Sequence, residues 1–98
     1  MSLSLVLRRC AEQDISEATR WYEREQPGRE KQFETQLEKA FERIKEHPTR
    51  TALYFQDVRF LLLDQFPYVI YYQVQVTRVE VIAVVHTQRS PRVWQRRI

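Results

Sequence analysis

The sequence predicts an α+β domain in which a helical hairpin packs on one face of a small, mainly antiparallel β-sheet. The first half of the chain carries apolar residues at helical spacing, whereas the second half carries short runs rich in β-branched and aromatic residues. The expected order of elements is therefore β-α-α-β-β-β. A length of 98 residues is that of one domain, so we expect residues 1–98 to fold as a single unit.

The first expected elements are a strand and a helix. Residues 3–8 are rich enough in Leu and Val for a strand. Asp14 can cap a helix, and Glu17 completes a capping-box pattern three residues later. Pro27 and the only glycine of the chain, Gly28, break this first helix.

A second helix is expected over residues 29–46, closed by Pro48. Trp21 and Tyr22 of the first helix are expected in the core beside it. The apolar stripe of the second helix recurs at a spacing of 3.6 residues, and it consists of Phe33, Leu37, Ala40, Phe41 and Ile44.

Three strands are expected in the second half, over residues 58–63, 69–76 and 79–86. The last two are joined closely enough, through residues 76–79, for a tight hairpin. A short tail over residues 87–98 follows the last strand.

Alternation along these strands predicts a sheet with two apolar faces. A helical hairpin covers one face, and a one-residue shift of register would exchange the two. The uncovered face is expected to be too apolar for solvent and too charged for a core, which usually marks a partner site. Its expected residues are Arg59, Leu61, Leu63, Tyr71, Ile82, Val84 and His86.

Charge is distributed unevenly along the chain. Residues 1–50 carry ten Lys or Arg and ten Asp or Glu, whereas residues 51–98 carry six Arg and three acids, which supplies the whole net charge of +3. Guanidinium groups suit bidentate contact with phosphate or carboxylate. A solvated terminus is the simpler interpretation of the arginines in the tail, which are Arg89, Arg92, Arg96 and Arg97.

Several classes of protein are not expected. No apolar run is long enough to span a bilayer, and the N-terminus lacks the charged start and cleavage site of a secretion signal. Cys10 is the only cysteine, so no internal disulfide forms, which suits the cytoplasm. With His47 and His86 it makes no metal-ligand spacing, so neither a metal nor a cofactor is expected.

Three segments resemble the RelE/ParE toxins of bacterial toxin–antitoxin systems. They are VRFLLL, which contains Arg59, followed by FPYVIYY over residues 66–72; the stretch AVVHTQRSPRVW over residues 83–94; and the close of the second helix at His47-Pro48. Their order and spacing are similar to those of the family over nearly the whole chain. The match is better to the ParE, or plasmid-stabilisation, branch than to the RelE branch.

The resemblance implies a growth-arresting toxin in the cytoplasm, neutralised by a small cognate antitoxin similar to ParD in a hetero-oligomer. The ParE branch implies inhibition of DNA gyrase by binding, without catalysis. The RelE branch implies a metal-independent endoribonuclease that cuts messenger RNA on the ribosome. A third possibility is an inactive homologue that only binds an antitoxin.

An RNA-cutting site would need an acid or base and cations to stabilise the charged intermediate. His86, Arg59 and Arg89 are the candidates, with Glu80 as a carboxylate. Members of the cutting branch usually have a basic residue at the position where this chain has Pro67-Tyr68. They also often carry lysines on the sheet, whereas the three lysines of this chain lie on the second helix. For His86 the simpler interpretation is a hydrogen bond that ties the last strand to the tail.

The residues expected to bind a target or an antitoxin lie on the sheet and in the tail. For Trp94 the simpler interpretation is packing on the core as an anchor for the tail, and His47 is interpreted as a helix C-terminal residue. The full candidate set is Arg59, Tyr68, Tyr71, His86, Arg89, Arg92, Trp94, Arg96 and Arg97.

Overall fold

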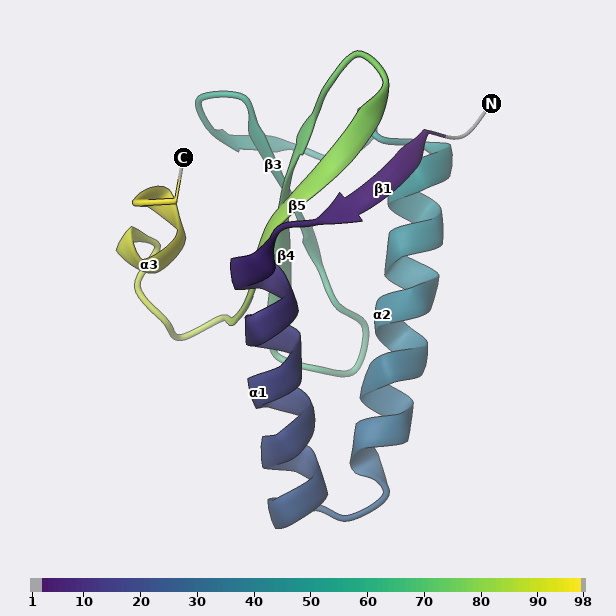
Figure 1. Ribbon diagram of the computed structural model, residues 1–98, viewed down its shortest axis with the longest axis vertical. Helices are drawn as coiled ribbons and strands as arrows, with labels where there is room; N and C mark the ends of the chain where they lie inside the picture. Colours follow the sequence, from purple (N-terminus) through teal and green to yellow (C-terminus); the bar gives the residue numbers. More distant parts are fainter. Residues whose placement is uncertain (1–2, 98) are drawn as a thin grey trace.

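The computed structural model describes residues 3–97, which form two long helices on one face of a five-stranded sheet and a short helix on the other (Figure 1). The strand order is β1-β5-β4-β3-β2, with β1 parallel to β5 and the other pairs antiparallel. The predicted α+β fold is confirmed, with β2 and α3 as additional short elements. In chain order the elements are β1 (Ser4–Leu7), α1 (Arg9–Glu25), α2 (Arg29–Glu46), β2 (Leu53–Phe55), β3 (Val58–Leu62), β4 (Tyr68–Val74), β5 (Arg78–His86) and α3 (Arg92–Gln95).

Helix α1 begins five residues before the predicted cap, so the prediction that Asp14 caps it is wrong. The chain enters the helix at Arg8, whose backbone is extended, and no side chain caps it. Asp14 lies inside the helix, where its carboxylate accepts the backbone N–H of Val84 at 3.1 Å and binds Arg97. A carboxylate with a charged partner and a strand amide is better stabilised than one at a solvent-exposed helix end.

Helix α2 has the predicted bounds, because its start and end are encoded locally. Gly28 precedes it at φ 94°, a left-handed conformation that glycine adopts without strain, and Pro48 lies just beyond its end. Tyr22 of α1 is buried as predicted, but Trp21 is 43% exposed, so its prediction as a core residue is wrong. The residues of the apolar stripe that are buried are Phe33, Leu37, Ala40 and Ile44.

A β-bulge changes which residues of β5 face the helices. The register shifts so that Tyr71 pairs with Ala83 but Tyr72 pairs with Val81, which leaves Ile82 as the extra residue. Val81 and Val84 therefore both pack in the helix-side core, although simple alternation would place them on opposite faces.

The prediction for the uncovered face is consequently wrong at five of its seven positions. On β3 the register is opposite to the predicted one, since Val58 packs on the far face. Tyr71 and Ile82 do lie on the far face, where α3 covers them. The helix-side core instead contains Leu61, Leu63 and Val84. Arg59 binds the loop after α2. His86 contacts Tyr68 beside α1.

The C-terminal helix closes the far face through Trp94. This side chain is 0% exposed, and its ring stacks on Tyr71 with 4.3 Å between centroids and 23° between planes. The prediction that Trp94 packs as an anchor is confirmed. Its neighbours in this second cluster are Val58, Ile82, Ala83 and Val85.

Replacing Trp94 by alanine should reduce the free energy of unfolding by about 3–5 kcal/mol, because a fully buried indole leaves a large cavity. Urea unfolding followed by circular dichroism measures the change. The matched control is Trp21→Ala, which removes an exposed indole and should cost less than about 1 kcal/mol. Equal losses in the two variants would contradict the assignment of Trp94 as the anchor of the far face.

Candidate functional site

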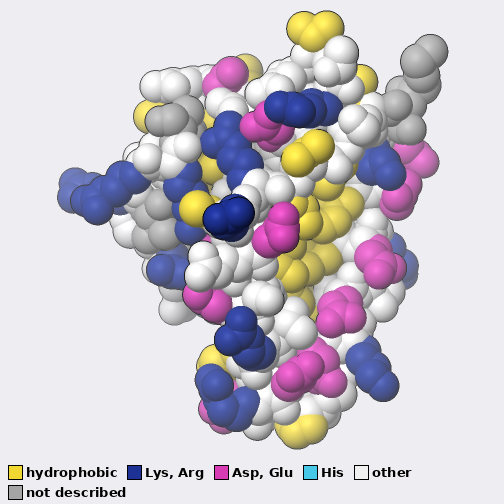
Figure 2. Space-filling view, viewed as in Figure 1, with side chains coloured by type: hydrophobic (Ala, Val, Ile, Leu, Met, Phe, Trp, Pro, Cys, Tyr) yellow, Lys and Arg dark blue, Asp and Glu magenta, His cyan; other side chains and the backbone are white. Residues whose placement is uncertain are grey.

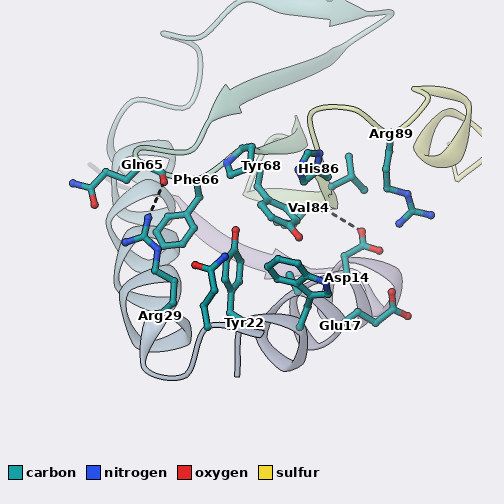
Figure 3. Close-up of a pocket in the computed structure, with 15 residues that line it drawn as sticks. Asp14, Glu17, Tyr22, Arg29, Gln65, Phe66, Tyr68, Val84, His86 and Arg89 are labelled. Carbon is teal, nitrogen blue, oxygen red and sulfur yellow. Dashed lines mark hydrogen bonds between the residues drawn. The ribbon is translucent and has the colours of Figure 1, made fainter. Parts of the chain in front are cut away.

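A deep hollow lies between α1, the start of β4 and the end of β5 (Figure 3). It has a volume of about 570 Å³, which is in the range of sites that hold small molecules or a few side chains of a partner. We call it the α1 groove. It is lined by Asp14, Glu17, Ala18, Trp21, Tyr22, Gln26, Arg29, Gln65, Phe66, Pro67, Tyr68, Val84, Val85, His86 and Arg89.

The middle of the α1 groove is aromatic. The Tyr22 ring lies edge-on to Trp21 at 5.1 Å and to Phe66 at 5.3 Å, and it lies 6.3 Å from Tyr68. Burial raises the pKa of both tyrosines, against a smaller lowering by Arg29 on Tyr22 and by Arg89 on Tyr68. Both hydroxyls therefore remain protonated at neutral pH and can donate hydrogen bonds into the groove.

An arginine stands at each end of the α1 groove (Figure 3). The Arg29 guanidinium lies over the Phe66 ring at 4.3 Å from its centroid and donates to the carbonyl of Gln65 at 3.3 Å. Among residues 3–97, the exposed Arg89 side chain has no ion pair or hydrogen bond. An apolar middle with a cation at each end is complementary to an apolar segment flanked by acidic residues.

His86 connects the end of β5 to the tail, as the simpler interpretation predicted. Its Nδ1 accepts the backbone N–H of Gln88 at 3.1 Å, and its carbonyl accepts the N–H of Arg89. The ring lies edge-on to Tyr68 at 5.4 Å. Because Nδ1 is an acceptor, the neutral ring carries its proton on Nε2.

The tail is held to α1 by Arg97. Its guanidinium contacts both carboxylate oxygens of Asp14, at 2.7 and 3.2 Å, and donates to the carbonyl of Ile82 at 3.1 Å. Arg8 donates to the carbonyl of Arg97 at 3.1 Å. Hydrogen bonding to Asp14 raises the pKa of Arg97. Of the predicted contact residues in the tail, Arg97 and Trp94 are thus engaged within the fold.

Arg59 does not join His86 and Arg89. It donates to the carbonyls of Thr49, at 3.1 Å, and Thr51, and so supports the loop after α2. It pairs with Tyr72 across the sheet, whereas His86 pairs with Tyr68. Four residues of strand separate the two positions, which is about 13 Å.

Glu80 is committed to ion pairs on the far side of the sheet. Arg8 approaches one oxygen at 3.0 Å and Arg78 approaches the other at 2.6 Å. The hydrogen bond from Arg8 is the main cause that lowers the pKa of Glu80, helped by Arg78. This carboxyl group is ionised at neutral pH and does not act as a proton donor there.

Within residues 3–97, no group of three or more His, Cys, Asp or Glu is arranged to hold a metal ion. No helix in the described part of the chain is long and apolar enough to cross a membrane.

The unequal charge of the sequence is visible on the surface. Figure 2 shows Lys and Arg side chains gathered mainly on the side of α3, whereas Asp and Glu side chains lie largely over α2. Arg89, Arg92 and Arg96 are exposed there. These are the predicted tail residues that remain available to a partner.

Comparison with known proteins identifies the family. Residues 5–91 match the family described as the ParE toxin of the type II toxin–antitoxin system parDE. The chain belongs to the ParE toxin family. A solved structure described as the chromosomal ParDE TA system from P. aeruginosa has the same fold, with a TM-score of 0.77 at 16% identity, covering 87% of this chain and 96% of that one. No curated protein sequence matches the chain significantly.

The sequence predictions named only three of the 15 residues that line the α1 groove as contact residues. Tyr68, His86 and Arg89 were predicted as contact residues, but Trp21, Arg29 and Phe66 were not. One signal was present in the sequence: Trp21 and Tyr22 are adjacent, and residues next to each other on a helix point about 100° apart. A second aromatic beside a core aromatic therefore projects from the edge of the buried stripe.

Replacing Glu80 by glutamine tests the ion pairs of this carboxylate. Since its pKa is lowered in the fold, its stabilisation is present above the ordinary glutamate pKa of about 4.3 and is lost as pH falls through the folded-state value. The variant should be less stable than the parent by about 0.5–1 kcal/mol at pH 7, and this gap should shrink at pH 3. Urea unfolding at both pH values measures it, and a gap that stays constant would contradict the assignment.

Proposed function

We propose that this ParE family protein is a cytoplasmic toxin that arrests growth by binding DNA gyrase. In the proposal a cognate antitoxin forms a hetero-oligomer with it and blocks the same surface. The observation that carries the choice of target is the separation of Arg59 from His86 and Arg89. It favours a binding protein over an RNA-cutting enzyme.

The argument against RNA cleavage rests on the positions of the charged groups. Metal-free cleavage needs a base, an acid and cations arranged around one phosphate. Arg59 is turned toward the carbonyls of Thr49 and Thr51, and Glu80 is held by two arginines. His86 and Arg89 remain as one titratable group and one cation, which is an incomplete set for this chemistry.

The exposed arginines are the proposed contact with gyrase. Arg89, Arg92 and Arg96 lie on one segment whose position is fixed by Trp94 and Arg97. Because Trp94 and Arg97 hold this segment in place, the other three arginines lose little conformational entropy when they bind a target. Arg59, Tyr71, Trp94 and Arg97 then support the surface instead of touching the target.

The α1 groove is the proposed site for the antitoxin. Its aromatic middle would take apolar side chains, and Arg29 and Arg89 would each pair with an acidic residue. Occupying Arg89 would also remove one of the three arginines proposed to contact gyrase. In the proposal this overlap is the physical means by which an antitoxin neutralises the toxin.

Replacing Arg89, Arg92 and Arg96 together by alanine should raise the concentration of toxin needed for half-inhibition of gyrase supercoiling by at least about tenfold. Three arginine contacts at roughly 0.5–1 kcal/mol each give this magnitude. Arg97 is left in place because it binds Asp14. Purified gyrase with relaxed plasmid provides the assay.

The matched control replaces three exposed cations elsewhere, Arg20, Lys31 and Lys39, by alanine. It lowers the net charge equally and should inhibit like the parent. Undiminished inhibition by the tail variant would remove the arginines from the proposal. An equal loss in both variants would show that net charge alone matters.

One observation favours an endoribonuclease as the second candidate: His86, Arg89 and Tyr68 line one groove. His86→Ala separates the two functions. A gyrase binder should keep its inhibition within about threefold, whereas an enzyme should lose about 10²–10⁴ of its cleavage rate. Cleavage of messenger RNA in a purified translation system, abolished by His86→Ala, would contradict the gyrase proposal. A protein harmless in both assays would be an inactive homologue.

A further inference from the structure

A second, smaller pocket lies where α2 ends. It has a volume of about 150 Å³, and its lining contains three basic side chains and no acid. Its floor is apolar. The lining residues are Arg43, Ile44, His47, Arg50, Thr51 and Leu61.

The three basic side chains have no partner among residues 3–97. Arg43, His47 and Arg50 are exposed, and none of their side chains makes an ion pair or a hydrogen bond within that range. The nearest acids in the sequence, Glu42 and Glu46, do not line the pocket, and Glu42 is bound by Lys45 at 3.2 Å. The positive charge of the pocket is therefore not neutralised within the fold.

The backbone brings these side chains to one side. Arg43 lies in the last turn of α2, and His47, four residues later, is the residue that caps its C-terminal end, so the two lie on the same side of the helix end. The N–H of His47 bonds to the carbonyl of Arg43 at 2.9 Å, and the N–H of Arg50 bonds to that of His47 at 3.2 Å. This turn folds the chain back, so that Arg50 stands beside the last turn of the helix.

The loop that carries Arg50 is held in place by hydrogen bonds from side chains of the sheet. Arg59 donates to the carbonyls of Thr49 and Thr51, and the fully buried Tyr72 donates to the carbonyl of Pro48 at 3.1 Å. A loop held by strand residues at three carbonyls loses little freedom when a ligand binds. Arg59 also adds a positive charge under the loop.

We propose that Arg43, His47 and Arg50 form a phosphate-binding site for the backbone of duplex DNA. Two arginines and a histidine that line one pocket without a carboxylate fit an oxyanion, and arginine guanidinium groups match phosphate in particular. The inference rests on the proposed function, since gyrase works on DNA and a toxin bound to it lies near the duplex. The contacts are independent of base sequence, because phosphates carry none.

Fluorescence anisotropy of a labelled 20-base-pair duplex with the purified full chain, without gyrase, tests the site. Arg43→Gln with Arg50→Gln should weaken binding at low salt by about tenfold. The slope of log affinity against log salt should become shallower by about 1.8, which is 0.9 for each lost phosphate contact. All replaced side chains are exposed, so the thermal melting of the variant should match that of the parent.

The control variant, Arg20→Gln with Arg24→Gln, removes the same net charge from α1. It should bind the duplex like the parent. Equal weakening in both variants, or none in the first, overturns the proposal. An acidic peptide and an RNA strand of the same length are tested as competing ligands at equal salt. If either binds the cluster more tightly than the duplex does, the choice of DNA is overturned.

The supercoiling assay keeps this result separate from the proposed function. Duplex binding that depends on Arg43 and Arg50 supports the site even if the parent protein does not inhibit gyrase. Inhibition of gyrase by a protein that does not bind the duplex through this cluster overturns the site and leaves the proposed function standing.

Discussion

The ion pair between Arg97 and Asp14 connects two segments that are 83 residues apart and determines which surfaces of the fold are free. Asp14 also accepts the N–H of Val84, so one carboxylate joins α1, β5 and the tail. With Arg97 held, Trp94 stays on Tyr71 and the far face of the sheet is closed. The pair is largely shielded from water, with 20% and 8% of the two side chains exposed, so it is screened less by salt than a surface pair would be.

With the far face closed, the proposed binding surfaces lie toward the two ends of β4. The α1 groove lies beside Asp14, where β4 begins and β5 ends, and the exposed arginines Arg89, Arg92 and Arg96 follow β5 along the chain. The loop after α2 lies near the other end of β4, where Arg59 and Tyr72 hold its backbone. The sheet thus acts as a rigid support. The side chains that remain free to bind a partner are those that make no hydrogen bond or ion pair within the described fold.

Local signals in the sequence were sufficient for most of the fold and insufficient for the site. The bounds of α2 follow from its apolar stripe, Gly28 and Pro48, all of which act within a few residues. Asp14 matches a capping pattern, but its true partner is distant in sequence. The bulge at Ile82 reverses the alternation of β5, and β2 has only three residues, too few for a periodic signal. The α1 groove combines residues from five segments, so only those near the resemblance motifs were predicted.

The most direct test of gyrase as the target is a pulse-label experiment after induction of this protein alone in a bacterial host. Incorporation of labelled thymidine and of a labelled amino acid is followed minute by minute. If the toxin acts on gyrase through its exposed arginines, DNA synthesis falls first and protein synthesis follows later. If protein synthesis falls first, the target is the translation machinery, and the incomplete set of His86, Arg89 and Tyr68 is sufficient for catalysis after all.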